Sequence, residues 1–197
     1  MIRIKSLTTE ELPAETQAAL AFSKQLMGYV PNSVMTMAHW PELLGAFRGL
    51  VSVIYGESAI DNGTKRLIGA VTSAAAACQY CKAHTTLGAI DLGVDEEKVK
   101  AVWSYQTSDL FSDAERAALD VAFAAGQTPS AVTDAHFERL SNYYTAREMT
   151  EIMAVISMFG FLNRWNDSLA TALEDKPFNS ASSLFDESQW QAGQHRK

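Results

Sequence analysis

Apolar residues recur three or four positions apart along most of the chain, the spacing of one face of an α-helix. Two such stripes are Leu44, Phe47, Val51 and Ile54, and Leu67, Val71, Ala74 and Cys78. No segment shows the alternation and the β-branched enrichment of a strand. The pattern predicts an all-α fold and places Cys78 on the inward face of its helix.

Capping motifs and glycines divide this pattern into separate helices. A Ser or Thr followed three residues later by Glu is a capping box, and a Gly often ends a helix. The predicted helices are 8–27, 41–56, 61–78, 82–92, 95–103, 112–126, 133–143 and 145–173. We therefore expect a single-domain helical bundle over residues 1–174. Residues 175–197 are expected to form a polar C-terminal tail that lies along the surface or reaches a neighbour.

A weak internal similarity connects two of the predicted helices. When the chain is shifted by about 85 residues, KRLIGAVTSAAAACQYC lies over TEIMAVISMFGFLNRWN. Asn163 and Asn166 then fall where Cys78 and Cys81 stand. Two explanations remain open. One is chance agreement between two amphipathic helices, and the other is a degenerate internal duplication in which only the first copy kept its sulfurs.

Composition and charge narrow the class of protein. The 197 residues are 47% hydrophobic and 20% charged, as in an ordinary globular domain. A formal net charge of −7 disfavours nucleic acid and anionic lipid as partners. No apolar run approaches the roughly 20 residues that span a bilayer, and the first residues lack the apolar stretch of a secretory signal. We expect a cytoplasmic protein without a membrane partner.

Both cysteines of the chain lie in one motif, Cys78-Gln79-Tyr80-Cys81-Lys82-Ala83-His84. In a reducing compartment such a pair is more often catalytic or metal-binding than structural. A helix start favours a thiolate, and His84 shares a helical face with Cys81 and can accept a proton at neutral pH. A thiolate of this kind attacks a peroxide and becomes a sulfenic acid, which the other cysteine resolves into a disulfide. The cycle requires an external dithiol but no metal or organic cofactor.

Other interpretations of this motif remain open. The two cysteines can be small apolar residues that occupy these positions by accident. A zinc site needs more ligands, so His39 or His136 would have to complete it. His84 can be a hydrogen-bonded interior histidine, and Tyr80 is expected to be a packing residue.

The sequence resembles the alkyl hydroperoxidase D and carboxymuconolactone decarboxylase-like superfamily. The matching pieces are Val30-Pro31-Asn32, Pro41-x-Leu43-Leu44, Cys78-x-Tyr80-Cys81-x-x-His84-Thr85, Asn163-Arg164 and Asn166-Asp167. The resemblance implies an all-helical homo-oligomer (dimer, trimer or hexamer) that acts as a thiol-dependent peroxidase on a small hydroperoxide. By the same resemblance Cys81 is the peroxidatic cysteine, Cys78 the resolving one, and His84 part of a proton relay.

Two positions depart from the family pattern. His84 follows the second cysteine by three residues instead of four, and the relay Glu twelve residues before the first cysteine is Arg66 here. A cation cannot be a general base, so Glu57, Asp61 or Glu151 would have to replace that Glu. Two alternative functions remain open. One is a decarboxylase-like lyase in which Arg66 binds a carboxylate, and the other is a non-catalytic redox-sensing or interaction module.

Overall fold

The computed structural model describes residues 2–196, apart from the side chains at 19, 22, 23 and 25–27. Every regular element in this part is helical, which confirms the predicted all-α class. The α-helices are α1 (Ala14–Met27), α2 (Asn32–Met37), α3 (Pro41–Ile54), α4 (Asn62–Ala75), α5 (Gln79–Asp91), α6 (Glu96–Lys100), α7 (Asp113–Gly126), α8 (Asp134–Ser141), α9 (Ala146–Leu169) and α10 (Asp175–Leu184). The 3-10 turns are η1 (Thr9–Glu11), η2 (Ala101–Ser104) and η3 (Gly193–His195).

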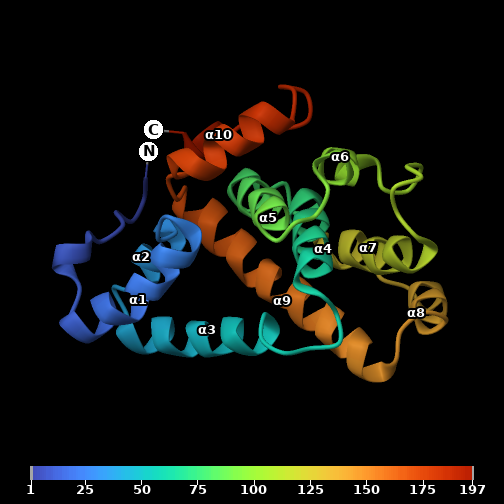
Figure 1. Cartoon of the computed structure of the whole chain (residues 1–197), viewed down its shortest axis with the longest axis horizontal. Helices are drawn as coiled ribbons and strands as arrows, with labels where there is room; N and C mark the ends of the chain where they lie inside the picture. Colours follow the sequence, from blue (N-terminus) through green and yellow to red (C-terminus); the bar gives the residue numbers. More distant parts are fainter. Residues whose placement is uncertain (1, 197) are drawn as a thin grey trace.

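Helix α4 lies at the centre and packs against α5, α7 and α9. The long α9 crosses the molecule diagonally, with α1–α3 on one side and α4, α5 and α7 on the other (Figure 1). Two glycines allow close helix crossings. A Cβ on Gly69 of α4 would collide with the ring of Phe159, and one on Gly126 of α7 would lie 2.7 Å from the Thr72 carbonyl oxygen. Small residues therefore set how closely the central helices approach.

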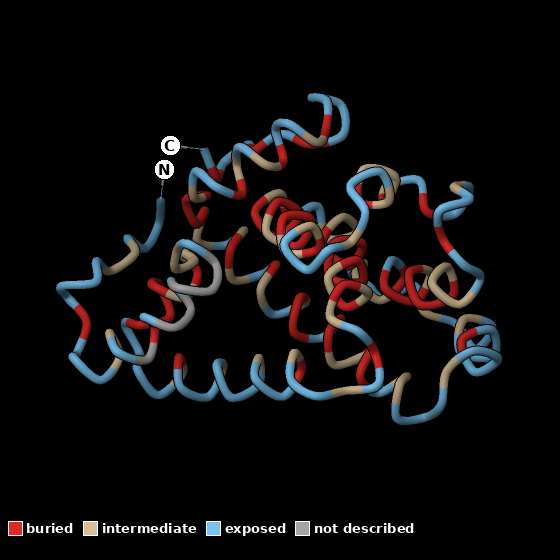
Figure 2. Tube along the Cα trace, viewed as in Figure 1, coloured by how far each residue is buried: buried red, intermediate tan, exposed pale blue. Residues whose placement is uncertain are grey.

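The N-terminal helices form a smaller core of their own. Its buried members are Leu12, Leu20, Met35, Met37, Ala38 and Leu44. Helix α3 is exposed along much of its length (Figure 2), and Val53 on it is 75% exposed. In residues 2–196 no helix is both long enough and apolar enough to cross a bilayer.

Several predicted helix starts are present with their caps. The Asp61 side chain accepts a hydrogen bond of 2.9 Å from the Thr64 backbone at the start of α4. The Ser112–Glu115 and Thr145–Glu148 pairs form complete capping boxes at the starts of α7 and α9. Local sequence therefore fixes where these helices begin.

The predicted helix over 61–78 is wrong at its end. Helix α4 stops at Ala75, and Ala77 has φ 57° in the left-handed region. The Cys78 N–H donates to the Ser73 carbonyl at 2.9 Å, which closes the turn. Cys78 is therefore the N-cap of α5 and does not share a helix with Leu67.

The predicted helix over 145–173 also ends early. Helix α9 stops at Leu169 because Ala170 is left-handed, with φ 48°. An irregular segment follows, and α10 then packs against α5. Residues 175–197, expected to be a polar tail, thus contain a helix and several buried side chains, among them Trp190 and His195.

Candidate functional site: a dithiol flanked by two histidines

The turn between α4 and α5 brings both cysteines to the start of α5. Cys78 is the N-cap and Cys81 the third residue of the helix, and both are free thiols with exposed fractions of 0% and 2%. A hydrogen bond between the two thiols, together with burial, raises the pKa of Cys78. The predicted pair is therefore assembled as a dithiol.

Cys81 has a second polar neighbour. The side-chain Nδ2 of Asn166, in α9, donates a hydrogen bond of 3.4 Å to the Cys81 sulfur. Asn166 is 1% exposed, and its neighbour Asn163 is 3% exposed. Hydrogen bonds to a sulfur favour its charged form, as does the partial positive charge of a helix N-terminus. The Cys81 sulfur thus lies beside the Asn166 amide and at the start of α5.

His84 lies one turn after Cys81 in a network of polar side chains. Its Nε2 is 2.7 Å from Oε2 of Glu174, and its Nδ1 is 3.2 Å from the hydroxyl of Tyr29. The ring stacks on that of Tyr80 at 4.4 Å between centroids. Since Nε2 faces a carboxylate, a neutral ring donates a hydrogen bond there and accepts one from the Tyr29 hydroxyl at Nδ1. Both ring nitrogens are therefore engaged by groups other than the cysteines.

Glu174 is the carboxylate of this network, and sequence reasoning missed it. Its Oε1 accepts a 2.8 Å hydrogen bond from the hydroxyl of Tyr80 and another from the backbone N–H of Asn32. Burial by itself would raise the pKa of Glu174, but the charge of His84 and these hydrogen bonds outweigh it and lower the pKa. Tyr80, expected to pack only, is buried and also donates to this carboxylate.

A second histidine lies beside the other cysteine. Nε2 of His195 is 3.0 Å from Oδ1 of Asp167, and Nδ1 is 2.8 Å from the carbonyl oxygen of Thr171. The Cys78 sulfur, an Asp167 carboxylate oxygen and a His195 ring nitrogen all lie within 4.8 Å of one another. His195 is 2% exposed. Sequence reasoning gave it no role because it lies in the expected tail.

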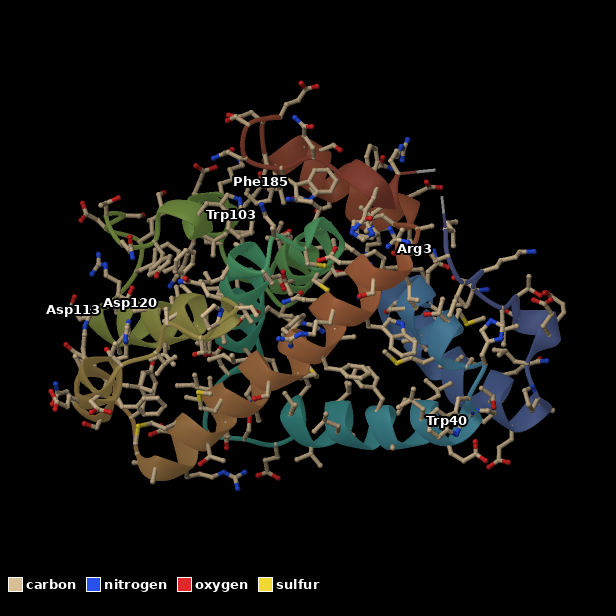
Figure 3. The ribbon with its side chains drawn as sticks, turned by 180° about the vertical axis from the view of Figure 1, so that it is seen from behind. Arg3, Trp40, Trp103, Asp113, Asp120 and Phe185 are labelled. Carbon is tan, nitrogen blue, oxygen red and sulfur yellow. The ribbon has the colours of Figure 1, made fainter. Side chains whose placement is uncertain are left out.

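The C-terminal segment is fastened over the first turn of α5. The Trp190 indole donates to the Gln79 carbonyl at 3.0 Å, and the Lys82 ammonium donates to the Gln189 carbonyl at 2.9 Å. Farther along, the rings of Trp103 and Phe185 lie 5.3 Å apart and join η2 to the end of α10 (Figure 3). The dithiol is thus covered by residues more than 100 positions later in the chain.

The histidines considered as zinc ligands are not near the cysteines. His39 is exposed and bonds to the Lys5 carbonyl at 2.9 Å, and His136 forms a capping box at the start of α8. Among residues 2–196, the group with three potential ligand atoms close together is the one around Cys78. In this group Nε2 of His195 lies at hydrogen-bond distance from the Asp167 carboxylate.

None of the three acids considered as relay substitutes contacts a cysteine. Glu57 is exposed, Asp61 caps α4, and Glu151 is bonded to Lys65 and Arg147. Arg66, which stands at the family's Glu position, lies with its guanidinium 4.3 Å from the centroid of a tyrosine ring. The carboxylate on His84 instead comes from the segment between α9 and α10.

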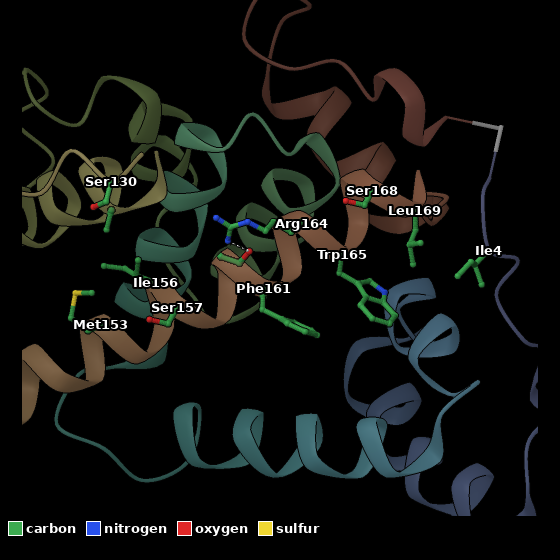
Figure 4. A pocket seen from close by; sticks show the side chains of 12 residues that line it. Ile4, Ser130, Met153, Ile156, Ser157, Phe161, Arg164, Trp165, Ser168 and Leu169 are labelled. Atoms are coloured by element: carbon green, nitrogen blue, oxygen red, sulfur yellow. Dashed lines mark hydrogen bonds between the residues drawn. The ribbon is translucent and has the colours of Figure 1, made fainter. Parts of the chain in front are cut away.

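A hollow in the surface lies on a different face of α9. A groove of about 880 Å³ follows the side of α9 that carries Ser157, Phe161, Arg164, Trp165 and Ser168 (Figure 4). Its lining includes neither cysteine. The groove is therefore separate from the dithiol.

Fold and site together define a helical protein with a buried dithiol. The chain matches the carboxymuconolactone decarboxylase family over residues 41–124. Its sequence is 35% identical to that of the debrominase Bmp8, and its fold matches the crystal structure of that protein with a TM-score of 0.86. The match covers 92% of this chain and 97% of that one. The chain belongs to the alkyl hydroperoxidase D-like and carboxymuconolactone decarboxylase-like superfamily.

Two further relatives share this fold or sequence. An uncharacterized peroxidase-related protein from Ralstonia eutropha JMP134, described as an alkylhydroperoxidase AhpD core, is 24% identical with a TM-score of 0.80, over 90% of this chain and 94% of that one. The uncharacterized protein YnjA of Escherichia coli (strain K12) is 29% identical over 153 residues, which are 71% of this chain and 84% of that protein. The first of these relationships supports the fold alone.

Proposed function

We propose that the protein is a thiol-dependent peroxidase that uses Cys81 as the attacking sulfur and Cys78 as the resolving one. The observation that carries the proposal is a pair of buried free thiols at the start of α5, with Asn166 and Cys78 both hydrogen-bonded to the Cys81 sulfur. The Asn166 amide and the helix start present positive partial charge to the Cys81 sulfur, while the pKa of Cys78 is raised.

In the first step the Cys81 thiolate attacks the outer oxygen of a hydroperoxide. A sulfur–oxygen bond forms, the O–O bond breaks, and the alkoxide leaves as an alcohol after taking a proton. His84 lies on the next turn of α5 with both ring nitrogens bonded, to Glu174 and Tyr29, so in this scheme its protons reach the sulfur through solvent. Its ring remains 12% exposed, so the network has contact with solvent.

In the second step Cys78 attacks the sulfenic sulfur of Cys81. A disulfide forms and water leaves. An external dithiol then reduces the disulfide, so the net reaction converts one hydroperoxide and one dithiol into an alcohol, water and a disulfide. No metal or organic cofactor takes part in this scheme.

A thiol titration with stoichiometric peroxide tests the proposal. The wild-type protein is expected to lose two free thiols per chain. Cys81→Ser should abolish this loss, and Cys78→Ser should leave a trapped sulfenic acid on Cys81. Unchanged thiol counts after peroxide treatment would contradict the proposal. A metal assay on the same sample separates the redox function from a zinc site.

A second candidate function is reductive dehalogenation. It is favoured by the 35% identity to the debrominase Bmp8, whose Cys-to-Ala variant has been crystallised with 2,3,4-tribromopyrrole. In this scheme the thiolate takes the halogen, the carbon takes a proton, and the second thiol displaces halide to give a disulfide. Release of one bromide from 2,3,4-tribromopyrrole for every two thiols lost, without reaction with hydroperoxides, would favour it over the peroxidase.

Two other functions make different predictions. A lyase of the decarboxylase type would keep its activity when both cysteines are changed to Ser. A non-catalytic redox sensor would be oxidised by peroxide but would not turn over with a dithiol present. Steady-state assays of the wild type and the double variant distinguish all of these.

The proposal includes a cytoplasmic homo-oligomer. Exposed apolar side chains support the assembly, since Phe161 in the α9 groove and Val53 on α3 are 40% and 75% exposed. Light scattering of the purified protein should give the mass of a dimer, trimer or hexamer, and a monomer at micromolar concentration would contradict it.

A further inference from the structure

We propose that His195, held by Asp167, is the acid–base group for Cys78, so that the C-terminal segment supplies a second histidine to the dithiol site. The inference rests on the proposed dithiol function and extends it to the resolving step. Nothing in the family match, which covers residues 41–124, includes either His195 or Asp167.

The position of the His195 ring is fixed by its two hydrogen bonds. Nδ1 lies 2.8 Å from the Thr171 carbonyl oxygen, and Nε2 lies 3.0 Å from Oδ1 of Asp167. Both partners are acceptors, so a ring that carries protons on both nitrogens satisfies both of them. An imidazolium paired with a carboxylate is therefore the arrangement that these contacts favour.

The backbone holds this pair against the cysteine. The Leu173 N–H donates to the His195 carbonyl at 2.9 Å, which ties η3 to the segment after α9. Arg3 donates to the Asp167 carbonyl at 3.0 Å and so fastens the end of α9 from the other side, where Figure 3 shows its side chain. The Cys78 sulfur lies within 4.8 Å of the reactive atoms of both members of the pair.

Two arginines lie near the pair, Arg196 next to His195 in the chain and Arg3 on the Asp167 carbonyl, and the titratable groups that face the ring come from α5 and α9. Cys78 and Tyr80 face it from the start of α5, and Asp167 faces it from α9. The centroids of the Tyr80 and His195 rings are 5.7 Å apart. Glu174 lies beyond Tyr80 and bonds to its hydroxyl. Asp167 is thus the carboxylate directly paired with His195.

Cys78 needs such a group because its surroundings oppose ionisation. The hydrogen bond to Cys81, burial, and the charges of Cys81 and Asp167 all raise the pKa of Cys78. An imidazolium close to a sulfur stabilises the thiolate. His195 therefore offsets the effects that keep Cys78 protonated.

The resolving step then balances without any added group. As Cys78 attacks the Cys81 sulfenic acid, the sulfur–sulfur bond forms and the sulfur–oxygen bond breaks. The His195 proton passes to the departing hydroxide, which leaves as water, and the Cys78 proton replaces it on the His195–Asp167 pair. In this scheme His84 and Glu174 take part in the proton transfers of the Cys81 step, whereas His195 and Asp167 take part in those of Cys78.

Rapid mixing with one equivalent of peroxide separates the two steps. Sulfenic acid on Cys81 is trapped with dimedone and counted by mass spectrometry, while disulfide formation is followed by loss of the second thiol. In His195→Gln the first step should stay within about twofold, and disulfide formation should slow about 100-fold, the lower range for loss of a general acid or base. His39→Gln is the matched control, because that ring is exposed and bonds only to a backbone carbonyl.

Two outcomes of this experiment would overturn the inference. One is a His195→Gln variant that forms its disulfide at the wild-type rate. The other is an equal slowing of both steps, which indicates only a disturbed fold. Asp167→Asn should reproduce the selective defect in a weaker form, since it removes the charge that holds the His195 proton.

A second measurement does not depend on peroxide at all. In a Cys81→Ser background, the rate of Cys78 alkylation by iodoacetamide is recorded against pH. Adding His195→Gln should move the midpoint upward by about one pH unit, a tenfold loss of thiolate at a given pH. If this shift appears while peroxide oxidises neither thiol, the peroxidase proposal fails and the role of His195 stands. No shift, or one bound metal ion per chain that His195→Gln releases, would overturn the inference.

Discussion

Oε2 of Glu174 lies 2.7 Å from Nε2 of His84, although 90 residues separate them along the chain. In the family pattern the relay acid belongs to the helix before the cysteines, where this chain has Arg66. Here the carboxylate reaches the histidine from the segment that joins α9 to α10. The carboxylate that contacts His84 therefore comes from the C-terminal part of the sequence.

Removal of this carboxylate is expected to slow turnover without unfolding the protein. Glu174→Gln keeps a hydrogen-bonding side chain but loses the charge that holds the His84 proton, so kcat/KM for a hydroperoxide should fall about 100-fold. Asp175→Asn is the control, because Asp175 is the exposed neighbour in sequence. Equal activity of the two variants would remove His84 and Glu174 from the mechanism.

The buried Lys65–Glu151 pair makes the fold sensitive to acid. Burial by itself would raise the pKa of Glu151, but Arg147, the Ile60 and Ala59 backbone N–H groups and Lys65 outweigh it and lower the pKa to about 2. A carboxyl with a depressed folded-state pKa contributes stability above its unfolded value near 4.5, and this contribution is lost as the pH falls toward 2. Urea unfolding from pH 7 to pH 3 should show the decline.

The variant Glu151→Gln tests this assignment. It leaves the Lys65 ammonium, which is 1% exposed, without its counter-charge, and it should reduce the free energy of unfolding by about 3 kcal/mol at pH 7. Its stability should also depend less on pH below 4.5 than that of the wild type. Glu57→Gln, at an exposed position, should change neither quantity.

Two glycine substitutions should have opposite effects on stability. Gly126→Ala places a Cβ 2.7 Å from the Thr72 carbonyl and 2.8 Å from the Ala75 side chain, so α4 and α7 must separate. We expect a loss of about 2 kcal/mol. Gly49→Ala, in the exposed part of α3 with nothing within 4 Å, should gain up to about 1 kcal/mol. The midpoints of thermal unfolding of the two variants test both expectations. An unchanged midpoint for Gly126→Ala would show that α4 and α7 are packed less closely than described.

The turn before the cysteines offers a stabilising change. Ala77 has φ 57°, a conformation that costs an alanine roughly 1 kcal/mol relative to glycine. Ala77→Gly should therefore raise the midpoint of thermal unfolding and leave the thiol chemistry unchanged. Ala76→Gly, one residue earlier at φ −84°, should have no such benefit. If Ala77→Gly destabilises the protein, the left-handed turn is not formed in solution.

The early ends of α4 and α9, relative to the predicted helices, have the same physical origin. Helix ends were predicted from glycine, the residue that adopts the left-handed conformation at least cost. Ala77 and Ala170 adopt it instead, because hydrogen bonds to the Ser73 and Asn166 carbonyls close the two turns. Alanine carries no sign of such a turn, so sequence reasoning extended both helices too far.

The features that depend on residues close together in the sequence could be predicted, whereas contacts between distant positions could not. The capping boxes, the all-α class and the neighbouring cysteines follow from residues within one turn of each other. Glu174, Asp167 and His195 act through contacts across 90, 28 and 24 residues. No spacing rule connects positions so far apart, and the polar composition after residue 174 concealed the few side chains that anchor this segment.

The placement of His195 has a practical consequence for work on the purified protein. Anything joined after residue 197 begins three positions beyond a buried imidazole, and Arg196 is itself stacked 3.6 Å from the Phe178 ring centroid. An affinity tag or fluorescent fusion at that end would be attached to the segment that covers the Cys78 and Cys81 sulfurs, and it would disturb the packing of that segment. A tag upstream of Met1 begins close to Arg3, which bonds to the Asp167 carbonyl, so kinetic values from the two formats should be compared before either is interpreted.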